Sequence, residues 1–525
     1  MSFESNKVRW RKRKRWPHNQ SRWSKRLAIG LLISLPLIAV LAFAVYVIAQ
    51  RARIVVNGAT ITVKSGGDFQ AALNRANPGD TILLEAGATF VGPFILPKNN
   101  GEQFIIIRTS ASDSQLPEPG QRIDPIRYAS ILPKIISSNG MSAIKSAAGA
   151  HHYRFIGVEL GPTKNGEGNI VELGDGSEKS VDELPHHIEF DRVYVHGSQT
   201  MGQRRGIAAN GRYIRIINSH FADIKRQGDE SQAIACWAGD GPIEIINNYL
   251  EAAAENIIFG GAGSNLKLVP SDIIVRDNHL NKPIKWREEG WLVKNLFEIK
   301  NGRRVKVMNN LMTNNWTSGQ SGTAVLFTVR ADNGPASVIE DVEFTDNLIS
   351  GAGGAVSVYG AEGGGGRRLT IRNNVFEDID GRKWEGSGQF LLCTEWDGLV
   401  IENNTILQTG NITSAYGNPI KGFIFRNNII AHNEYGFHGD NRAPGQDSVD
   451  VFFPRALIGN NAIIGGGSSI LKSRNMYPVS LAELKLTNPS KSDYRPLAGS
   501  SLKGKGASGA DIGANLDPQR VGRVN

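Results

Sequence analysis

Two basic residues, Lys300 and Arg330, stand at the ends of consecutive strand-like segments, "NLFEIK" and "AVLFTVR". Alternation along each segment places the apolar residues on one face, so we expect Lys300 and Arg330 on the opposite, polar face. The same alternation in "AVSVYG" and "FLLCTE" predicts one outward column, made of Lys300, Arg330, Tyr359 and Glu395, with Glu298 two residues before the lysine. Like charges on neighbouring strands repel each other. The column therefore predicts an anion bound across the two cations.

An acidic polysaccharide would supply such an anion. Cleavage of a uronate chain by β-elimination needs a base for the proton α to the carboxylate and a cation for the charge that develops there. An amine serves as a base when its pKa falls towards neutral, and a nearby guanidinium favours this fall. Glu298, Tyr359 and Glu395 would then contact the substrate. The alternative is a solvated face, on which Glu298 and Glu395 shield the two cations.

Aromatic residues gather next to this column. The loop "PIKWREEGWLVKN" (283–295) contains Trp286 and Trp291, and Trp316 follows soon after the next bend. Large flat rings suit stacking on pyranose rings. We predict that the three tryptophans bind substrate, and the alternative is that they pack the loop onto the body.

Residue types that bind metals occur elsewhere. The segment "GDESQ" (228–232) and Glu255 fall on neighbouring repeats, so their hard oxygens are an alternative Ca²⁺ site. The His-His pairs at 151–152 and 186–187 stand at strand starts without ligand-like partners, and we predict that they are ordinary loop residues.

A short phrase recurs from residue 212 onward, in which an alternating strand ends on a polar pair, as in "IEIINNYL" and "VKVMNNLM". A strand-only repeat of 24 to 37 residues is typical of a solenoid, whose coils bury one strand face by stacking. Asparagine tolerates the left-handed conformation of a tight bend, and amides stacked about 4.8 Å apart can form a hydrogen-bonded ladder. The predicted ladder consists of Asn248, Asn278, Asn310, Asn347, Asn374, Asn404, Asn428 and Asn461.

These turns, the ladder and the segment "GGDFQAALNRANPGDTILLEAGATFVGPFILP" (66–97) resemble right-handed parallel β-helix proteins of the pectate-lyase type. In that group an amphipathic helix caps the first coil. Here Asp68 fits as its N-cap, with Phe69, Ala72 and Leu73 on the buried face.

The resemblance implies an all-β chain that folds as a right-handed parallel β-helix solenoid with an N-terminal capping helix. The two cysteines, Cys236 and Cys393, lie in separate strand-like segments and are expected to be small buried residues instead of a disulfide. The predicted parts of the solenoid are the N-terminal cap (54–105), the β-helix (106–466) and the C-terminal cap and tail (467–525).

The step from "NLFEIK" to "LFTVR" one coil later is similar to the lysine-then-arginine arrangement of the alginate lyase and chondroitinase B family. In that family the lysine is the base and the arginine assists it, which implies Lys300 as the base and Arg330 as its partner. The family also has two calcium-binding glutamates ahead of the lysine on its strand. The corresponding positions here are near Val293 and Asn295. No cofactor is therefore firmly implied, and Ca²⁺ is left as an open alternative.

The net charge of +9 comes from one end of the chain. Residues 1–26 hold ten Lys and Arg against Glu4, so the remaining residues are formally neutral, and a nucleic-acid-binding body is not expected. Residues 27–49 carry no charge and are long enough to cross a bilayer. A basic segment before such a span predicts a cytoplasmic tail, an uncleaved transmembrane helix and an extracytoplasmic body. A cleaved signal peptide is the alternative.

From the sequence we thus predict a membrane-anchored, extracytoplasmic protein that acts on acidic polysaccharide, as a lyase that works by β-elimination. Two alternatives stay open: a non-catalytic carbohydrate-binding scaffold of the envelope or surface, and a glycoside hydrolase or epimerase on the same fold. The expected partners are acidic polysaccharide and the membrane, with no nucleic acid.

Overall fold

Short runs of alternating apolar residues, separated by asparagine and glycine turns, form three strands in each coil of the chain. The computed structural model describes residues 58–522. The predicted cytoplasmic tail (1–26) and membrane anchor (27–49) lie outside the described residues. Within residues 58–522, the structure contains no helix that is both long and apolar enough to cross a bilayer.

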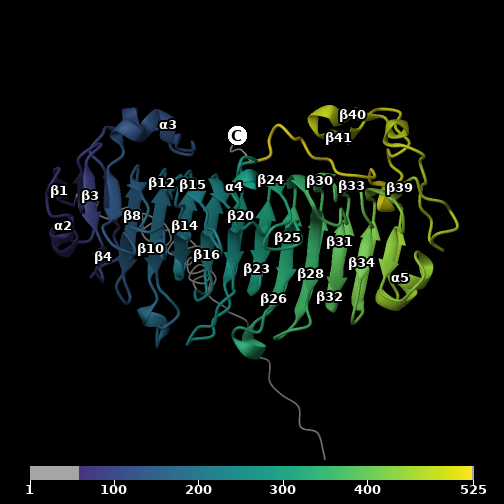
Figure 1. Cartoon of the computed structure of the whole chain (residues 1–525), viewed down its shortest axis with the longest axis horizontal. Helices are drawn as coiled ribbons and strands as arrows, with labels where there is room; N and C mark the ends of the chain where they lie inside the picture. Colours follow the sequence, from purple (N-terminus) through teal and green to yellow (C-terminus); the bar gives the residue numbers. More distant parts are fainter. Residues whose placement is uncertain (1–57, 523–525) are drawn as a thin grey trace, which may run out of the picture. The chain divides into compact units, whose positions relative to one another are not determined.

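The strands assemble into three parallel sheets of 14, 12 and 13 strands, in which each strand pairs with its counterparts in the coils before and after it. Figure 1 shows the strands side by side from the purple N-terminal end to the yellow C-terminal end. This is the parallel solenoid that the repeat predicted. The 14-stranded sheet consists of β1 (Thr60–Val63), β2 (Thr81–Leu84), β5 (Ile105–Thr109), β8 (His151–Ile156), β11 (His186–Asp191), β14 (Arg212–Ile217), β17 (Ile243–Ile246), β20 (Ser271–Arg276), β23 (Gly302–Met308), β26 (Ile339–Thr345), β29 (Gly366–Arg372), β32 (Trp396–Glu402), β35 (Ile420–Arg426) and β38 (Leu457–Gly459).

The 12-stranded sheet is the one that contains the predicted column of outward residues. It consists of β4 (Phe94–Leu96), β7 (Ile144–Ser146), β10 (Asn169–Leu173), β13 (Arg205–Ala209), β16 (Gln232–Cys236), β19 (Glu255–Phe259), β22 (Asn295–Ile299), β25 (Thr323–Thr328), β28 (Gly354–Tyr359), β31 (Leu391–Thr394), β34 (Thr413–Ala415) and β37 (Phe437–Gly439).

The 13-stranded sheet completes each coil. It consists of β3 (Thr89–Gly92), β6 (Lys134–Ser137), β9 (Glu159–Leu160), β12 (Tyr194–His196), β15 (His220–Ile224), β18 (Tyr249–Ala252), β21 (His279–Asn281), β24 (Leu311–Asn315), β27 (Leu348–Ala352), β30 (Val375–Ile379), β33 (Thr405–Gln408), β36 (Ile429–Ala431) and β39 (Ala462–Ile464).

Helices are few and short in the described residues. The α-helices are α2 (Phe69–Arg75), α3 (Pro125–Tyr128), α4 (Trp286–Glu289) and α5 (Gln446–Phe452). Single 3₁₀ turns are η1 (Asp113–Gln115), η2 (Ala129–Ile131), η3 (Val181–Glu183), η4 (Gly334–Ala336), η5 (Leu481–Leu484), η6 (Pro489–Lys491) and η7 (Ala507–Gly509). An antiparallel pair, β40 (Leu486–Asn488) and β41 (Asp493–Pro496), lies in the C-terminal segment.

The predicted capping helix is confirmed by α2, which lies at the purple end of the stack in Figure 1. The carboxylate of Asp68 accepts a hydrogen bond from the Ala71 amide at 2.8 Å, which satisfies one of the free N–H groups of the first turn. Phe69, Ala72 and Leu73 are buried, as the amphipathic pattern predicted. The helix thus covers the apolar end of the first coil.

The asparagine ladder is also confirmed. In each pair the Nδ2 of one asparagine donates to the Oδ1 of the next, as from Asn310 to Asn347 (3.0 Å) and from Asn347 to Asn374 (3.0 Å). The two members of each polar pair have different structural roles. The first member has the left-handed backbone, as at Asn309 (φ 55°), while the second points inward and builds the ladder. Because every amide group in the ladder is paired, the bends are buried without unsatisfied polar atoms.

The apolar core runs along the inside of the coils. Phe297 and Ile299 are fully buried in it, as predicted, and both cysteines are buried and free. The C-terminal segment runs back along the solenoid, above the strands in Figure 1. Its Gly522 amide donates to the Asn309 carbonyl at 2.9 Å, which ties the end of the chain to the middle of the stack.

Candidate active site

The register of the 12-stranded sheet differs from the alignment predicted for the outward column. Ile299 pairs with Phe327, which pairs with Val358. The outward position after these buried residues is therefore occupied in successive coils by Lys300, Thr328, Tyr359 and Thr394. The prediction that Arg330 and Glu395 share this level is wrong, because the strands end at different levels and the two residues lie beyond Thr328 and Thr394 respectively.

Lys300 follows directly after β22 and leans towards the preceding coil. Its Nζ lies 3.7 Å from Oε1 of Glu298, and its side chain is 16% exposed. A Cβ added to Gly261 in the preceding coil would lie 3.4 Å from the lysine Cδ, so the lysine stem passes over that glycine. Glu298 points outward from the coil, as predicted, but it is buried under its neighbours and accepts hydrogen bonds from Asn295 (3.2 Å) and Thr328 (3.3 Å).

Arg330 lies on the adjacent coil and leans the other way. Its amide donates to the Lys300 carbonyl at 3.1 Å, so the two backbones are neighbours even though the side chains are not level. The guanidinium lies 4.8 Å from the ring centroid of Tyr359 and donates to Glu362 at 2.9 Å. With 42% of its side chain exposed, Arg330 reaches solvent. Glu362, and not Glu395 as predicted, is thus the carboxylate that shields Arg330.

Glu395 has a different neighbourhood. It stands just after β31 with a left-handed backbone (φ 45°) and accepts a hydrogen bond from Asn418 at 2.8 Å. It lines a surface hollow of about 210 Å³ together with Trp396, Arg367 and Lys421. The structure therefore separates Glu395 from Lys300 and places it in a hollow of its own.

A buried ion cluster spans the coil of Lys300 and the two coils before it, and its central residue, Lys294, was missed by the sequence analysis. The Lys294 ammonium lies 2.7 Å from Glu255 and 2.6 Å from Glu230, and its side chain is only 7% exposed. Glu255 is fully buried and also accepts a hydrogen bond from Gln232 at 2.8 Å. The predicted grouping of residues 228–232 with Glu255 is therefore present, but it surrounds an ammonium group. Only knowledge of the register, which pairs Glu255 with Asn295, could have placed Lys294 there.

Burial and charge set the ionisation of this cluster. Burial raises the pKa of Glu255, and the nearby charges of Glu298 and Glu230 add to the rise against the opposing effect of Lys294. Burial acts to lower the pKa of Lys294, but Glu255 and Glu230 outweigh it and raise that pKa overall. Partial burial acts to raise the pKa of Glu230, but the hydrogen bond and charge of Lys294 outweigh it and lower that pKa overall. Lys294 is therefore a permanent cation in this sheet.

This arrangement decides whether the residues fit a calcium ion. Ca²⁺ takes about six to eight oxygen ligands at about 2.3–2.6 Å. Here the space between the two carboxylates of Glu230 and Glu255 contains the Lys294 ammonium. The side chain of Asn295 donates to Glu298 and to Gln320, so its amide group presents hydrogens to them. The residues present do not fit a resident Ca²⁺, and the open alternative of a calcium site here is corrected: Lys294 supplies the positive charge.

The three predicted sugar-binding tryptophans are buried together. Trp286, Trp291 and Trp316 are 1%, 6% and 4% exposed and form one apolar cluster with Trp384. The Lys225 ammonium lies 5.0 Å and 4.7 Å from the ring centroids of Trp286 and Trp291. Buried rings offer no face to a pyranose, so the stacking role is wrong and the alternative, packing of the loop onto the body, is correct.

Neither a family model nor a curated protein matches the chain. Among solved structures, the PL6 family alginate lyase AlyGC is 16% identical, with a TM-score of 0.53 over 89% of this chain and 59% of that one. The chain thus spans about three fifths of the length of that enzyme. The lacto-N-biosidase of Eubacterium ramulus is 13% identical with a TM-score of 0.41, over 80% of this chain and 68% of its own. Pectate lyase Pel9A is 12% identical with a TM-score of 0.26, over 87% and 96%. The chain has the right-handed parallel β-helix fold of the pectate-lyase type, as the sequence resemblance implied, and it is distantly similar to alginate lyase.

Proposed function

We propose that the protein is a polysaccharide lyase that cleaves a uronate-containing chain by β-elimination, on the outward face of the 12-stranded sheet. One observation supports this most: Lys300 and Arg330 start from adjacent coils, joined by a backbone hydrogen bond, and both side chains reach solvent. One solved structure with a TM-score above 0.5 is an alginate lyase, and alginate is a polyuronate. That match supports the substrate class.

Substrate binding would use the exposed ion pair of Arg330. An ion pair between partly exposed side chains, such as Arg330 with Glu362, contributes only about 0–1 kcal/mol. A substrate carboxylate can therefore displace Glu362 at little cost and form a charge-assisted, two-pronged contact with the guanidinium. Tyr359, whose ring lies under Arg330, would then lie next to the bound sugar.

Lys300, in its neutral form, would remove the proton from the carbon α to the substrate carboxylate. The electron pair of that C–H bond forms the new carbon–carbon double bond, and the bond from the neighbouring carbon to the glycosidic oxygen breaks. The departing oxygen takes a proton from water. During this step negative charge grows on the carboxylate, where Arg330 stabilises it. Lys294 would act at a distance, by neutralising carboxylates that would otherwise repel the substrate.

The test is the absorbance of unsaturated uronate ends released from a panel of alginates, pectins and glycosaminoglycans. Lys300→Ala should abolish turnover with binding nearly intact, because a neutral base adds little ground-state affinity. Arg330→Ala should weaken both binding and turnover. Lys306→Ala is the matched control, since Lys306 is an exposed lysine of the same coil on the 14-stranded sheet.

The panel also decides between this proposal and its alternatives. Each cation already has its own carboxylate, an arrangement that equally suits a solvated or purely binding face. If the wild-type protein binds polysaccharide through both residues but releases no unsaturated ends, the scaffold function replaces the lyase. Release of saturated ends would indicate a hydrolase.

The cellular location of the protein is part of the same proposal. The basic segment 1–26 and the uncharged segment 27–49 support a single-pass anchor with the solenoid outside the cytoplasm. An extracytoplasmic body would meet polysaccharide directly, which agrees with the proposed substrate.

A further inference from the structure

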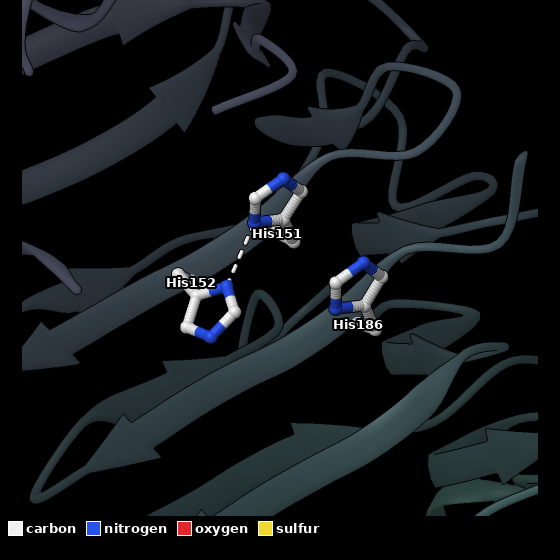
Figure 2. Close-up of side chains that lie close together, drawn as sticks. All are labelled: His151, His152 and His186. Atoms are coloured by element: carbon white, nitrogen blue, oxygen red, sulfur yellow. Dashed lines mark hydrogen bonds between the residues drawn. The ribbon is translucent and has the colours of Figure 1, made fainter. Parts of the chain in front are cut away.

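Four histidines form a compact cluster on the 14-stranded sheet, away from the proposed active site. His151 and His152 begin β8, His186 and His187 begin β11, and the register pairs His151 with His186. The rings of His151 and His186 stack at 4.6 Å, and those of His152 and His187 stack at 4.5 Å. Figure 2 shows three of these rings close together on the two neighbouring strands. The prediction that these pairs lack ligand-like partners is wrong.

The backbone explains why alternation in the sequence hid the cluster. Successive residues of a strand normally point to opposite faces. Here His152 and His187 have left-handed backbones, with φ of 56° and 52°. As a result each of them lies beside the histidine that precedes it, with Nδ1 atoms 2.7 Å apart in the first pair and 2.8 Å apart in the second.

Other coils use the same left-handed position for opposite charges. Arg304 pairs with Asp272 at 2.6 Å, and Arg368 pairs with Asp341 at 2.6 Å, and all four residues have positive φ. In those coils a cation on one strand neutralises an anion on the next. In β8 and β11, by contrast, both strands present imidazole, and each ring nitrogen at the centre has another imidazole nitrogen as its neighbour.

The spacing of the nitrogens suits a metal ion. The ligand atoms of His151, His152 and His186 all lie within 4.8 Å of one another. Two imidazole nitrogens that share a zinc ion, each about 2.0–2.1 Å from it, stand about 3–3.4 Å apart. The rings of His151 and His186 are stacked nearly parallel, with 4° between their planes, so they must rotate to direct their nitrogens at one ion.

We propose that this cluster binds one divalent transition-metal ion of the zinc class, through His151, His152 and His186. Imidazole favours late first-row divalent ions over Ca²⁺ or Mg²⁺. The fourth ligand is either His187 or a water, because a hollow of about 160 Å³ opens beside His187 and Tyr213. Since the ligands come from two successive coils, the bound ion clamps β8 to β11. It is a structural site, independent of the proposed lyase reaction.

The experiment uses the full-length chain without a polyhistidine tag, stripped with a chelator and then dialysed against Zn²⁺. We expect one ion per chain and a higher melting temperature with the ion than without it. The double variant His151→Asn/His186→Asn should lose at least tenfold in affinity. His432→Asn/His438→Asn is the matched control and should bind like the wild type, because these two histidines lie outside the cluster.

A second measurement needs no variant. The zinc K-edge absorption spectrum of the wild-type protein should show at least three imidazole ligands. A spectrum with fewer imidazoles, or a double variant that folds and binds zinc as tightly as the control, would overturn the proposal.

Discussion

Replacing Lys294 with methionine should test whether the buried ion cluster is organised by an ammonium group. Methionine retains most of the length and apolar stem of the lysine, so the variant removes the charge and little volume. Glu255, which is fully buried, and Glu230 then lose the cation that lies 2.7 Å and 2.6 Å from them. Breaking a buried pair by removing one partner costs about 3–5 kcal/mol, because the other charge is left uncompensated.

The cost should depend on pH in a definite direction. Because the pKa of Glu255 is raised in the folded protein, its neutral form is favoured by the fold. The stability that this contributes is fully present below the unfolded pKa of about 4.3 and is lost as the pH rises through the folded pKa. Without Lys294 the pKa of Glu255 in the folded protein rises further. The Lys294→Met variant should therefore be least stable at pH 8 and regain stability towards pH 5.

Thermal melts at several pH values measure this cost. The entropy of unfolding is about 2 cal/mol/K per residue, so a chain of this length should lose about 3–5 °C at pH 8. Lys285→Met, at an exposed lysine near the start of α4, should melt like the wild type. The double variant Lys294→Met/Glu255→Gln should regain about 2 kcal/mol, since no buried charge then remains on Glu255. A Lys294→Met variant that melts like the wild type, or a double variant that is as unstable as the single one, would refute the reasoning.

Three further outcomes follow from the fold and the charge distribution. Ile299→Asp should destabilise by more than about 4 kcal/mol because it buries an unpaired charge, whereas Lys300→Ala should leave the melting temperature nearly unchanged; equal losses would contradict the observed in–out register. Asn347→Leu should cost about 2–4 kcal/mol, because it removes the Oδ1 that accepts from the backbone amide and the Nδ2 of Asn310, and the Nδ2 that donates to the Val307 carbonyl; the exposed Asn418→Ala should cost little in the same denaturant titration. Protease added to intact cells, or to spheroplasts where an outer membrane is present, should digest the solenoid and spare segment 1–26; a protected solenoid would exclude the proposed topology.

The repeat made the fold predictable, because one physical requirement recurs in every coil. Asn310 and its counterparts must both bend the chain and satisfy buried amides, and few residue types do both, so the ladder stands out in the sequence. The capping helix was predictable for a similar reason: Asp68 and the apolar spacing of Phe69, Ala72 and Leu73 are local signals. Features that depend on neighbours in sequence are visible without a structure.

The candidate site depends on neighbours in space, and there the prediction failed in part. The ends of the two strand-like segments predict that Arg330 is level with Lys300, but β22 ends at Ile299 while β25 continues one residue past its partner Phe327. The prediction that Lys300 and Arg330 lie on adjacent coils is confirmed, because the Arg330 amide donates to the Lys300 carbonyl. The predictions for the tryptophans and the histidine pairs are wrong for a related reason. Alternation predicts the side of a strand on which a residue lies, but not whether a loop buries it, as happens to the tryptophans. A left-handed residue such as His152 also breaks the alternation itself.

Lys294 and Lys300 lie at the two ends of the same strand, β22, and their surroundings favour a structural role for Lys294 and a catalytic role for Lys300. Lys294 is 7% exposed and lies within 2.7 Å of two carboxylates, so its proton is held by partners on both sides. Lys300 is 16% exposed, and Glu298, which lies 3.7 Å from its Nζ, is already engaged by Asn295 and Thr328. Because Glu255 and Glu230 raise the pKa of Lys294, its ammonium keeps its proton near neutral pH. Lys300, the more exposed of the two, is therefore the lysine placed to contact a substrate. Loss of Lys294 should lower the stability of the protein, whereas loss of Lys300 should lower turnover alone.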